Sequence, residues 1–223
     1  MKNYYLLILV IWISLSSCSS VKIIDKPVVM NPERDSLTLE YLETRYGLKQ
    51  EKPTINPKMV VVHWTAIPTL EKTLKAFNPV KLPNWRPEIA GAGALNVGAQ
   101  FVIDQDGKIY RLFPETYMAR HVIGLNYCAI GIENVGGLED MPLTKKQLRS
   151  NVKLIKYLKK KYPAIEYVIG HLEYQNFENH ELWLEKDPNY RTQKTDPGVD
   201  FLNSIRQKTS KYNWKPVPER IIK

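Results

Sequence analysis

Two of the four histidines in the chain stand at the ends of short apolar runs. The first run, MVVVH, ends at His63, and the second, YVIGH, ends at His171. Runs rich in valine and isoleucine favour buried strands, so each histidine is expected where a core strand opens onto a cleft. A single histidine at a strand end is usually structural, but two in matching positions favour a shared metal site.

Two imidazoles do not complete a catalytic metal site. Catalytic zinc takes three protein ligands and keeps a fourth position for water. The residue types alone leave the third ligand open. The candidates are His121, His180, Cys128, Glu133 and the acidic residues of the loop 172–197.

The apolar pattern supplies the elements that must position these side chains. Helices are expected over 36–47, with Ser36 as N-cap and Gly47 as the stop, and over 68–77, 143–162 and 199–209. Strands are expected at 59–63, 127–135 and 166–170, and the runs 97–103 and 108–113 form a hairpin around Asp106-Gly107. This order predicts a single α/β domain with a mixed central sheet, helices beside it and the metal site at one sheet edge.

The N-terminus carries an export signal. Residues 1–17 contain Lys2 and an apolar run that is too short for an ordinary spanning helix. The sequence LSSC, ending at Cys18, resembles the bacterial lipobox, in which the cysteine becomes the lipidated first residue. Ser19 is not an acidic retention residue, which favours the outer membrane. We therefore expect a signal peptide over 1–17, a lipidated cysteine with a tether over 18–35, and the folded domain over 36–223.

The composition and net charge limit the number of domains and the classes of binding partner. The chain has 223 residues and 43% hydrophobic content, which suits one domain with a full core. Its formal net charge is +9, which favours a carboxylate-bearing or polyanionic partner or an anionic membrane surface. Export disfavours nucleic acid, and a monomer is expected. If Cys18 carries lipid, no intramolecular disulfide is possible, and Cys128 is expected to be a small buried apolar residue.

Six motifs occur in an order that resembles a known enzyme family. They read VVVHWTA, NVGAQFVIDQDGKIYRLFPE, ARHVIGLN, AIGIENVG, GHLEY and KTDPG. Together they resemble the zinc-dependent N-acetylmuramoyl-L-alanine amidases, a family shared with peptidoglycan recognition proteins and phage amidase lysozymes. The resemblance covers roughly Met59 to Phe201. The lipobox adds a closer similarity to outer-membrane lipoprotein amidases of Gram-negative bacteria.

The resemblance implies a metal site and a set of catalytic residues. One zinc ion is expected on His63, His171 and Asp196, a site with net positive charge that acidifies bound water. Lys194 lies two residues before Asp196 and points the same way in an extended segment, so it can stabilise the oxyanion of amide hydrolysis. Glu133, a carboxylate among apolar neighbours, is the implied general base. Relatives without this glutamate use a tyrosine just before the hairpin, and this chain has none there.

The same resemblance places a substrate cleft at the loop ARHVIGLN. His121 and Asn126 are expected to bind the muramyl lactyl or peptide portion, with Arg120 and Trp64 as weaker candidates, and Trp64 could equally lie in the core. The expected reaction is hydrolysis of the amide between N-acetylmuramic acid and L-alanine in peptidoglycan or its fragments, by a lipid-anchored periplasmic enzyme. The alternatives are a peptidoglycan-binding module without catalysis and a zinc hydrolase acting on another amide, such as a cross-bridge peptide bond.

Overall fold

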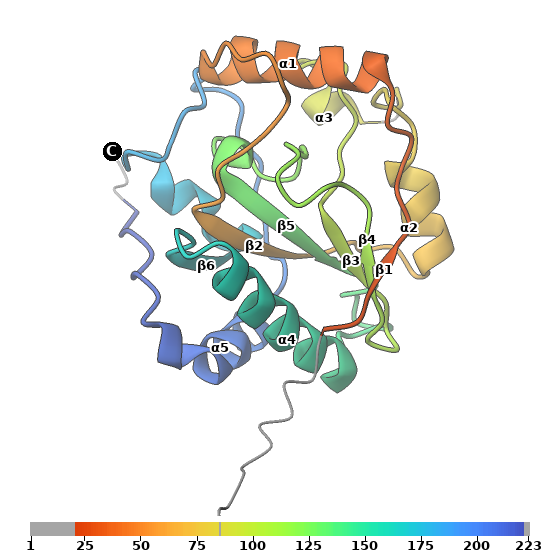
Figure 1. Ribbon diagram of the computed structural model, residues 1–223, viewed down its shortest axis with the longest axis vertical. Coiled ribbons are helices and arrows are strands. Elements are labelled where there is room, and N and C mark those ends of the chain that lie inside the picture. Colours follow the sequence, from red (N-terminus) through yellow and green to blue (C-terminus); the bar gives the residue numbers. More distant parts are fainter. Residues whose placement is uncertain (1–20, 85, 221–223) are drawn as a thin grey trace, which may run out of the picture.

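The computed structural model describes residues 21–84 and 86–220, and one mixed sheet runs through their centre (Figure 1). The strand order is β1-β4-β3-β5-β2-β6. The β3–β4 pair is the expected antiparallel hairpin, and the other pairs are parallel. The strands are β1 (Ile23–Asp25), β2 (Met59–Trp64), β3 (Phe101–Ile103), β4 (Ile109–Arg111), β5 (Ala129–Asn134) and β6 (Tyr167–Gly170).

Helices flank the sheet, as the sequence pattern predicts. The longest begins after Thr144, whose side chain forms a capping box with Gln147. None of the helices in the described part of the chain is both long enough and apolar enough to cross a membrane. The helices are α1 (Pro32–Tyr46), α2 (Leu70–Phe77), α3 (Pro87–Ala90), α4 (Lys145–Lys161) and α5 (Val199–Lys208), with short 3-10 turns at η1 (Asn126–Cys128), η2 (His171–Phe177) and η3 (Ser210–Tyr212).

The N-terminal part of the domain corrects the expected boundary at residue 36. Strand β1 pairs with β4 at the sheet edge, and Val28 is buried, so the tether predicted over 18–35 is wrong from residue 21 onward. Helix α1 begins at Pro32 with Asn31 as N-cap, because Asn31 Oδ1 accepts a hydrogen bond from the backbone N–H of Arg34. Its end at Gly47, which has a positive φ of 73°, is confirmed. Cys18 and the signal segment lie outside the described residues.

The two faces of the sheet are covered by different parts of the chain. Successive strand residues point to opposite faces. Val60 and Val62 of β2 pack in one core cluster with the apolar side of α4 and with α5. Met59 and Val61 pack in a second cluster formed by loop residues and β6. His63 continues the alternation of Met59 and Val61, so its side chain lies on the loop-covered face and α4 lies on the other.

Register brings the two strand-end histidines together. Strand β2 lies between β5 and β6 and is parallel to both. Val62 pairs with Gly170, so His63 in β2 and His171, the first residue after β6, follow directly on that pair. The prediction that both histidines reach one end of the sheet is confirmed. The buried valines before His63 fix the direction in which its ring points, since a packed strand has little freedom.

Candidate metal centre

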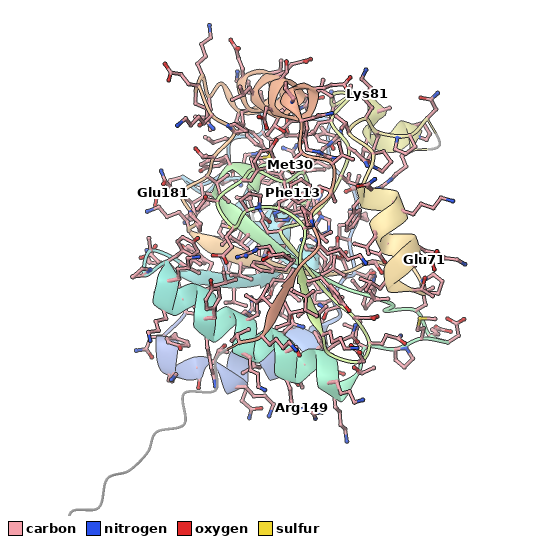
Figure 2. All side chains as sticks on the ribbon, turned by 45° about the vertical axis from the view of Figure 1, so that its right-hand side comes forward. Met30, Glu71, Lys81, Phe113, Arg149 and Glu181 are labelled. Carbon is pink, nitrogen blue, oxygen red and sulfur yellow. The ribbon has the colours of Figure 1, made fainter. Side chains whose placement is uncertain are left out.

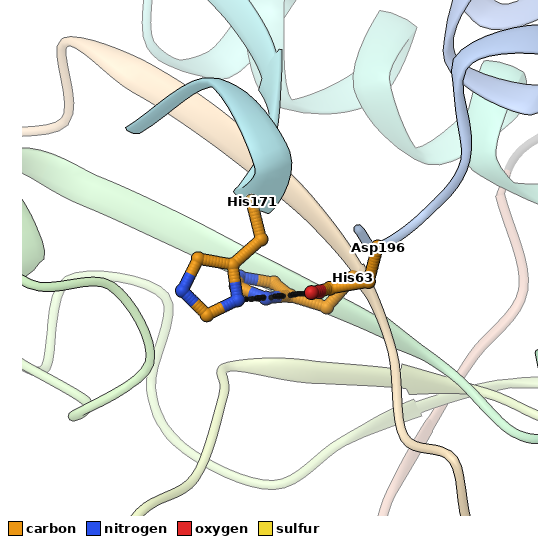
Figure 3. A group of neighbouring side chains, drawn as sticks. All are labelled: His63, His171 and Asp196. Atoms are coloured by element: carbon orange, nitrogen blue, oxygen red, sulfur yellow. Dashed lines mark hydrogen bonds and ion pairs between the residues drawn. The ribbon is translucent and has the colours of Figure 1, made fainter. Parts of the chain in front are cut away.

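Three donor atoms converge where β2 and β6 end (Figure 3). His63 Nδ1 lies 3.0 Å from His171 Nδ1 and 3.1 Å from Asp196 Oδ2. His171 Nδ1 lies 3.2 Å from the same Asp196 oxygen. All three residues are buried. A tetrahedral zinc ion with bonds of about 2.0–2.1 Å sets its ligand atoms about 3.3 Å apart, so this triangle has the size of one face of such a site.

A hydrogen-bond chain sets the tautomer of His63. The Nε2 atom of His121 lies 3.3 Å from the carbonyl oxygen of Ala129, which can only accept, so His121 Nε2 carries the proton. Burial, helped by the neighbouring His63, lowers the pKa of His121 well below its usual value, so the ring is neutral and its Nδ1 is an acceptor. His63 Nε2 lies 3.1 Å from that Nδ1 and therefore donates to it. The other ring nitrogen of His63, Nδ1, is the one that faces the donor triangle.

The other two donors are in the protonation states that a metal requires. Burial lowers the pKa of His171 to about 4, although the Asp196 carboxylate opposes this shift. Burial would raise the pKa of Asp196, but His171 and His63 outweigh it and hold that pKa below its ordinary value. The site therefore presents neutral imidazole nitrogen and an ionised carboxylate, a donor set that fits zinc.

Glu133 faces the same cavity as the donor triangle. The cavity has a volume of about 510 Å³, and its lining includes the three donor residues, Glu133 and Lys194. Burial and the nearby Asp196 raise the pKa of Glu133 well above its usual value, while Lys194 and Arg86 oppose that shift. Glu133 Oε2 is buried and has no hydrogen-bond partner among the described residues. A buried carboxylate oxygen without a partner is costly, which indicates a functional position.

Lys194 reaches this cavity from the loop that carries Asp196. Its side chain is half-buried, and within the described part of the chain it forms no hydrogen bond or ion pair. It is close enough to disfavour protonation of His171 as well as of Glu133. The ammonium group is thus available for an anion that forms inside the cavity.

The predicted substrate residues divide into two pairs. Trp64 and His121 are half-buried and line the cavity, which places Trp64 in the cleft wall. Arg120 and Asn126 also line it, but they are buried and hydrogen-bonded to the protein itself.

Asn126 organises the loop that carries His121. Its Oδ1 accepts from the backbone N–H groups of His121 at 2.8 Å and Val122 at 2.7 Å. Its Nδ2 donates to the hydroxyl of Tyr46 at 2.8 Å. The Asn126 side chain therefore positions the backbone beside His121.

Arg120 performs a similar task for the segment 86–96. Its guanidinium donates to the carbonyl oxygens of Ile89, Gly93 and Leu95 and to the hydroxyl of Tyr190. The three bonds to carbonyl oxygens tie the segment to the loop that carries Arg120, and the fourth bond ties that loop to Tyr190.

The structure shows which of the candidates for the third ligand lies beside His63 and His171. Asp196, an acid of the loop 172–197, joins the triangle. His180 is half-buried beside Tyr167 and Phe177, where its Nδ1 accepts from the N–H of Leu182, so it is not part of the triangle. Cys128 is buried, as expected.

Most of the other lining residues were not predicted from the sequence, and Arg86, Tyr190 and Thr192 are examples with polar side chains. Arg86 comes from the proline-rich segment, and Tyr190 and Thr192 come from the loop before Asp196. No periodicity marks them. The only signal was the length of the two loops, since long loops in compact domains are often functional.

Comparison with known proteins gives a family and a fold. A family model described as N-acetylmuramoyl-L-alanine amidase matches residues 53–199. The structure is similar to N-acetylmuramoyl-L-alanine amidase LysC from Clostridium intestinale URNW, with a TM-score of 0.53 and 24% identity, covering 87% of this chain and 99% of that chain. It is also similar to the endolysin LysCS of the same organism, with a TM-score of 0.53 and 23% identity, covering 88% and 98%. No curated protein matches the chain.

Proposed function

Because the chain belongs to the N-acetylmuramoyl-L-alanine amidase family, we propose that it is a zinc-dependent enzyme acting on peptidoglycan or its fragments. The bond cleaved is the amide between the lactyl group of N-acetylmuramic acid and the L-alanine of the stem peptide. One observation carries the proposal: a triangle of three metal-type donors shares a cavity with a carboxylate oxygen that has no partner.

His63, His171 and Asp196 would hold the zinc ion. When bound there, zinc supplies Lewis acidity that polarises the amide carbonyl and lowers the pKa of water. The protein contributes the direction of the donor atoms. His63 is held by its packed strand and by the hydrogen bond to His121, and orienting bonds of this kind are typical of metal-binding histidines.

Glu133 manages the proton in this proposal. Its Oε2 takes a proton from the attacking water and then delivers it to the nitrogen of the leaving L-alanine amine. The raised pKa of Glu133 suits both transfers, because a group that ionises closer to neutral pH accepts and returns a proton more readily.

Lys194 stabilises the oxyanion that develops on the amide carbonyl. The ammonium group has no competing partner among the described residues, so it enters the reaction without breaking a bond. Trp64 and His121 form the wall against which the substrate lies, whereas Arg120 and Asn126 contribute by holding that wall in place.

The cellular setting belongs to the same proposal. Lipidation of Cys18 would anchor the enzyme, as a monomer, to the outer membrane of a Gram-negative bacterium, with its domain in the periplasm. The cysteine lies outside the described residues, so this part depends on the lipobox sequence alone.

Digestion of defined muropeptides followed by mass spectrometry tests the reaction. We expect the wild-type chain to release intact stem peptide with a free L-alanine amine and His171→Ala to release none. His180→Gln serves as the matched control, because His180 is a histidine outside the cavity. Cleavage within the stem or cross-bridge would instead assign another amide, and binding without release of product by the zinc-loaded wild type would assign a binding module.

A further inference from the structure

Helix α4 carries a line of basic side chains on its outer side. Five of them recur at helical spacing, and we call them the basic stripe. They are Lys145, Arg149, Lys153, Lys156 and Lys160. At 100° per residue they fall within an arc of about 80° and extend over about 22 Å of helix. Figure 2 shows the labelled Arg149 directed away from the domain.

The basic stripe has no internal use that would explain it. Four of its residues are exposed and Lys156 is half-buried. Among the described residues none of the five side chains has a hydrogen-bond or ion-pair partner. Helix α4 contains no acidic residue. By contrast, Lys161 of the same helix pairs with Glu115, and Lys159 donates to two backbone carbonyl oxygens, so the helix does use lysines structurally where partners exist.

The basic stripe cannot serve the catalytic cavity, because the two lie on opposite faces of the sheet. Helix α4 packs on the face of Val60 and Val62. The cavity lies on the face of His63 and Glu133, under the loops. A substrate in the cavity is therefore separated from the stripe by the full thickness of the sheet.

The start of the described chain lies on the same side as the stripe. Ile23 of β1 pairs with Ile109 of β4, and the turn before Ile109 is bonded to α4, because Ser150 Oγ donates to the carbonyl oxygen of Gly107. Figure 1 shows β1 beginning beside α4. Cys18 precedes Val21 by only three residues, which span at most about 10 Å of extended chain. A lipid on Cys18 would thus hold this side of the domain at the bilayer surface.

We propose that the basic stripe of α4 docks the domain on an anionic phospholipid surface, with the catalytic cavity facing away from the bilayer. The charge of the stripe complements anionic headgroups, and each basic residue near such a surface strengthens binding by about fivefold at moderate ionic strength. This orientation leaves the cavity open toward the space in which peptidoglycan lies. The argument for orientation rests on the proposed lipidation of Cys18, whereas the argument for surface binding rests on the stripe alone.

Vesicle sedimentation tests the docking separately from lipidation and from catalysis. The mature chain with Cys18→Ser is mixed with vesicles of equal parts phosphatidylglycerol and phosphatidylethanolamine, and with vesicles of phosphatidylcholine alone. We expect binding to the anionic vesicles only, and its loss at high salt. The stripe variant Arg149→Gln/Lys153→Gln/Lys160→Gln should bind the anionic vesicles at least tenfold more weakly.

A charge-matched control makes the result specific. Lys52→Gln/Lys72→Gln/Lys75→Gln removes the same net charge from three exposed lysines outside α4 and should retain vesicle binding. Unchanged thermal unfolding of both triple variants shows that the fold is intact, whatever the outcome for amidase activity. The proposal is overturned if both triple variants lose vesicle binding equally, or if the stripe variant keeps its vesicle binding. It is also overturned if the stripe variant still binds vesicles but no longer binds insoluble peptidoglycan.

Discussion

His63 and Glu133 occupy the same register position on the neighbouring parallel strands β2 and β5. The backbones of adjacent strands are about 4.8 Å apart, and residues at one register position face the same side of the sheet. A metal-type donor and an acid–base candidate are therefore placed side by side by the pairing of β2 with β5.

Replacement of Glu133 by Gln should remove the proton-transfer group and leave the donor triangle in place. We expect kcat on muropeptides to fall by about 10²–10⁴-fold, because that is the usual contribution of a positioned acid or base. Zinc content by atomic absorption should remain at the wild-type level. The control Glu181→Gln alters an exposed glutamate, and equal activity losses in both variants would contradict the assignment.

The same Glu133→Gln variant should be more stable than the wild type at mildly alkaline pH. The unfolded carboxyl ionises near the ordinary value of 4.5, whereas the folded carboxyl has a raised pKa, so the folded state holds the extra proton between these two values. Wild-type stability is then lost as pH rises from the unfolded pKa through the folded pKa, and the variant escapes this loss. Urea denaturation in the presence of a chelator, repeated across pH, measures the difference. Midpoints that stay equal at every pH would rule out this effect.

Substitutions at His121 should change zinc affinity in an order set by hydrogen bonding. His121→Phe keeps a ring but leaves His63 Nε2–H without an acceptor, and we expect zinc to bind about 10–100-fold more weakly. His121→Asn supplies an amide oxygen near the position of Nδ1 and should recover part of the affinity. Competition with a chromophoric chelator measures both dissociation constants. If His121 acts only as bulk in the wall, the Phe variant will bind zinc better than the Asn variant.

Asn126→Ala should destabilise the domain. The substitution leaves the N–H groups of His121 and Val122 without their acceptor, at a cost of about 1–3 kcal/mol for the buried N–H group of Val122 and less for the partly buried one of His121. Urea denaturation measures the loss, and Asn179→Ala at an exposed loop position is the control. A free energy of unfolding equal to that of the wild type would show that the loop does not need this side chain.

Lys194→Met should lower kcat with little change in KM, because the proposed contact forms only as the oxyanion develops. The expected fall is about 10²–10³-fold, typical for loss of one oxyanion donor. Lys194→Arg, which keeps the charge, should restore part of the rate. Lys208→Met changes an exposed lysine of α5 and should leave both constants unaltered. A rise in KM alone would assign Lys194 to substrate binding.

Local patterns were sufficient to predict the parts of the fold and the candidate site that depend on neighbouring residues. The valine run before His63, the Asp106-Gly107 turn and the capping residue Thr144 each act within a few residues of the chain, and all three elements were predicted. Asn31 followed by Pro32 is an equally local signal, and it marks the true start of α1, whereas the prediction placed the N-cap at Ser36.

Features that depend on distant partners could not be predicted in this way. Strand β1 has only three residues, which are too few to show the alternating pattern of a strand. Its partner β4 lies more than eighty residues later in the chain. The roles of Arg120 and Asn126 follow from buried acceptors and donors supplied by remote loops. The family resemblance implied substrate contact for both residues, and the sequence does not distinguish a polar loop residue that binds a ligand from one that binds the protein itself.

The hydrogen bonds from Arg120 to the segment 86–96 affect which changes of sequence that segment can accept. Their acceptors are backbone carbonyl oxygens, which every residue type provides. Substitutions at exposed positions of the segment, such as Pro87, Ala90 and Ala94, therefore leave these bonds to Arg120 in place, whereas Ile89 and Leu95 are constrained by their burial in the core. Loop grafts that preserve Arg120, Ile89, Leu95 and the length of the segment would change the lining of the cavity while the donor triangle stays in place.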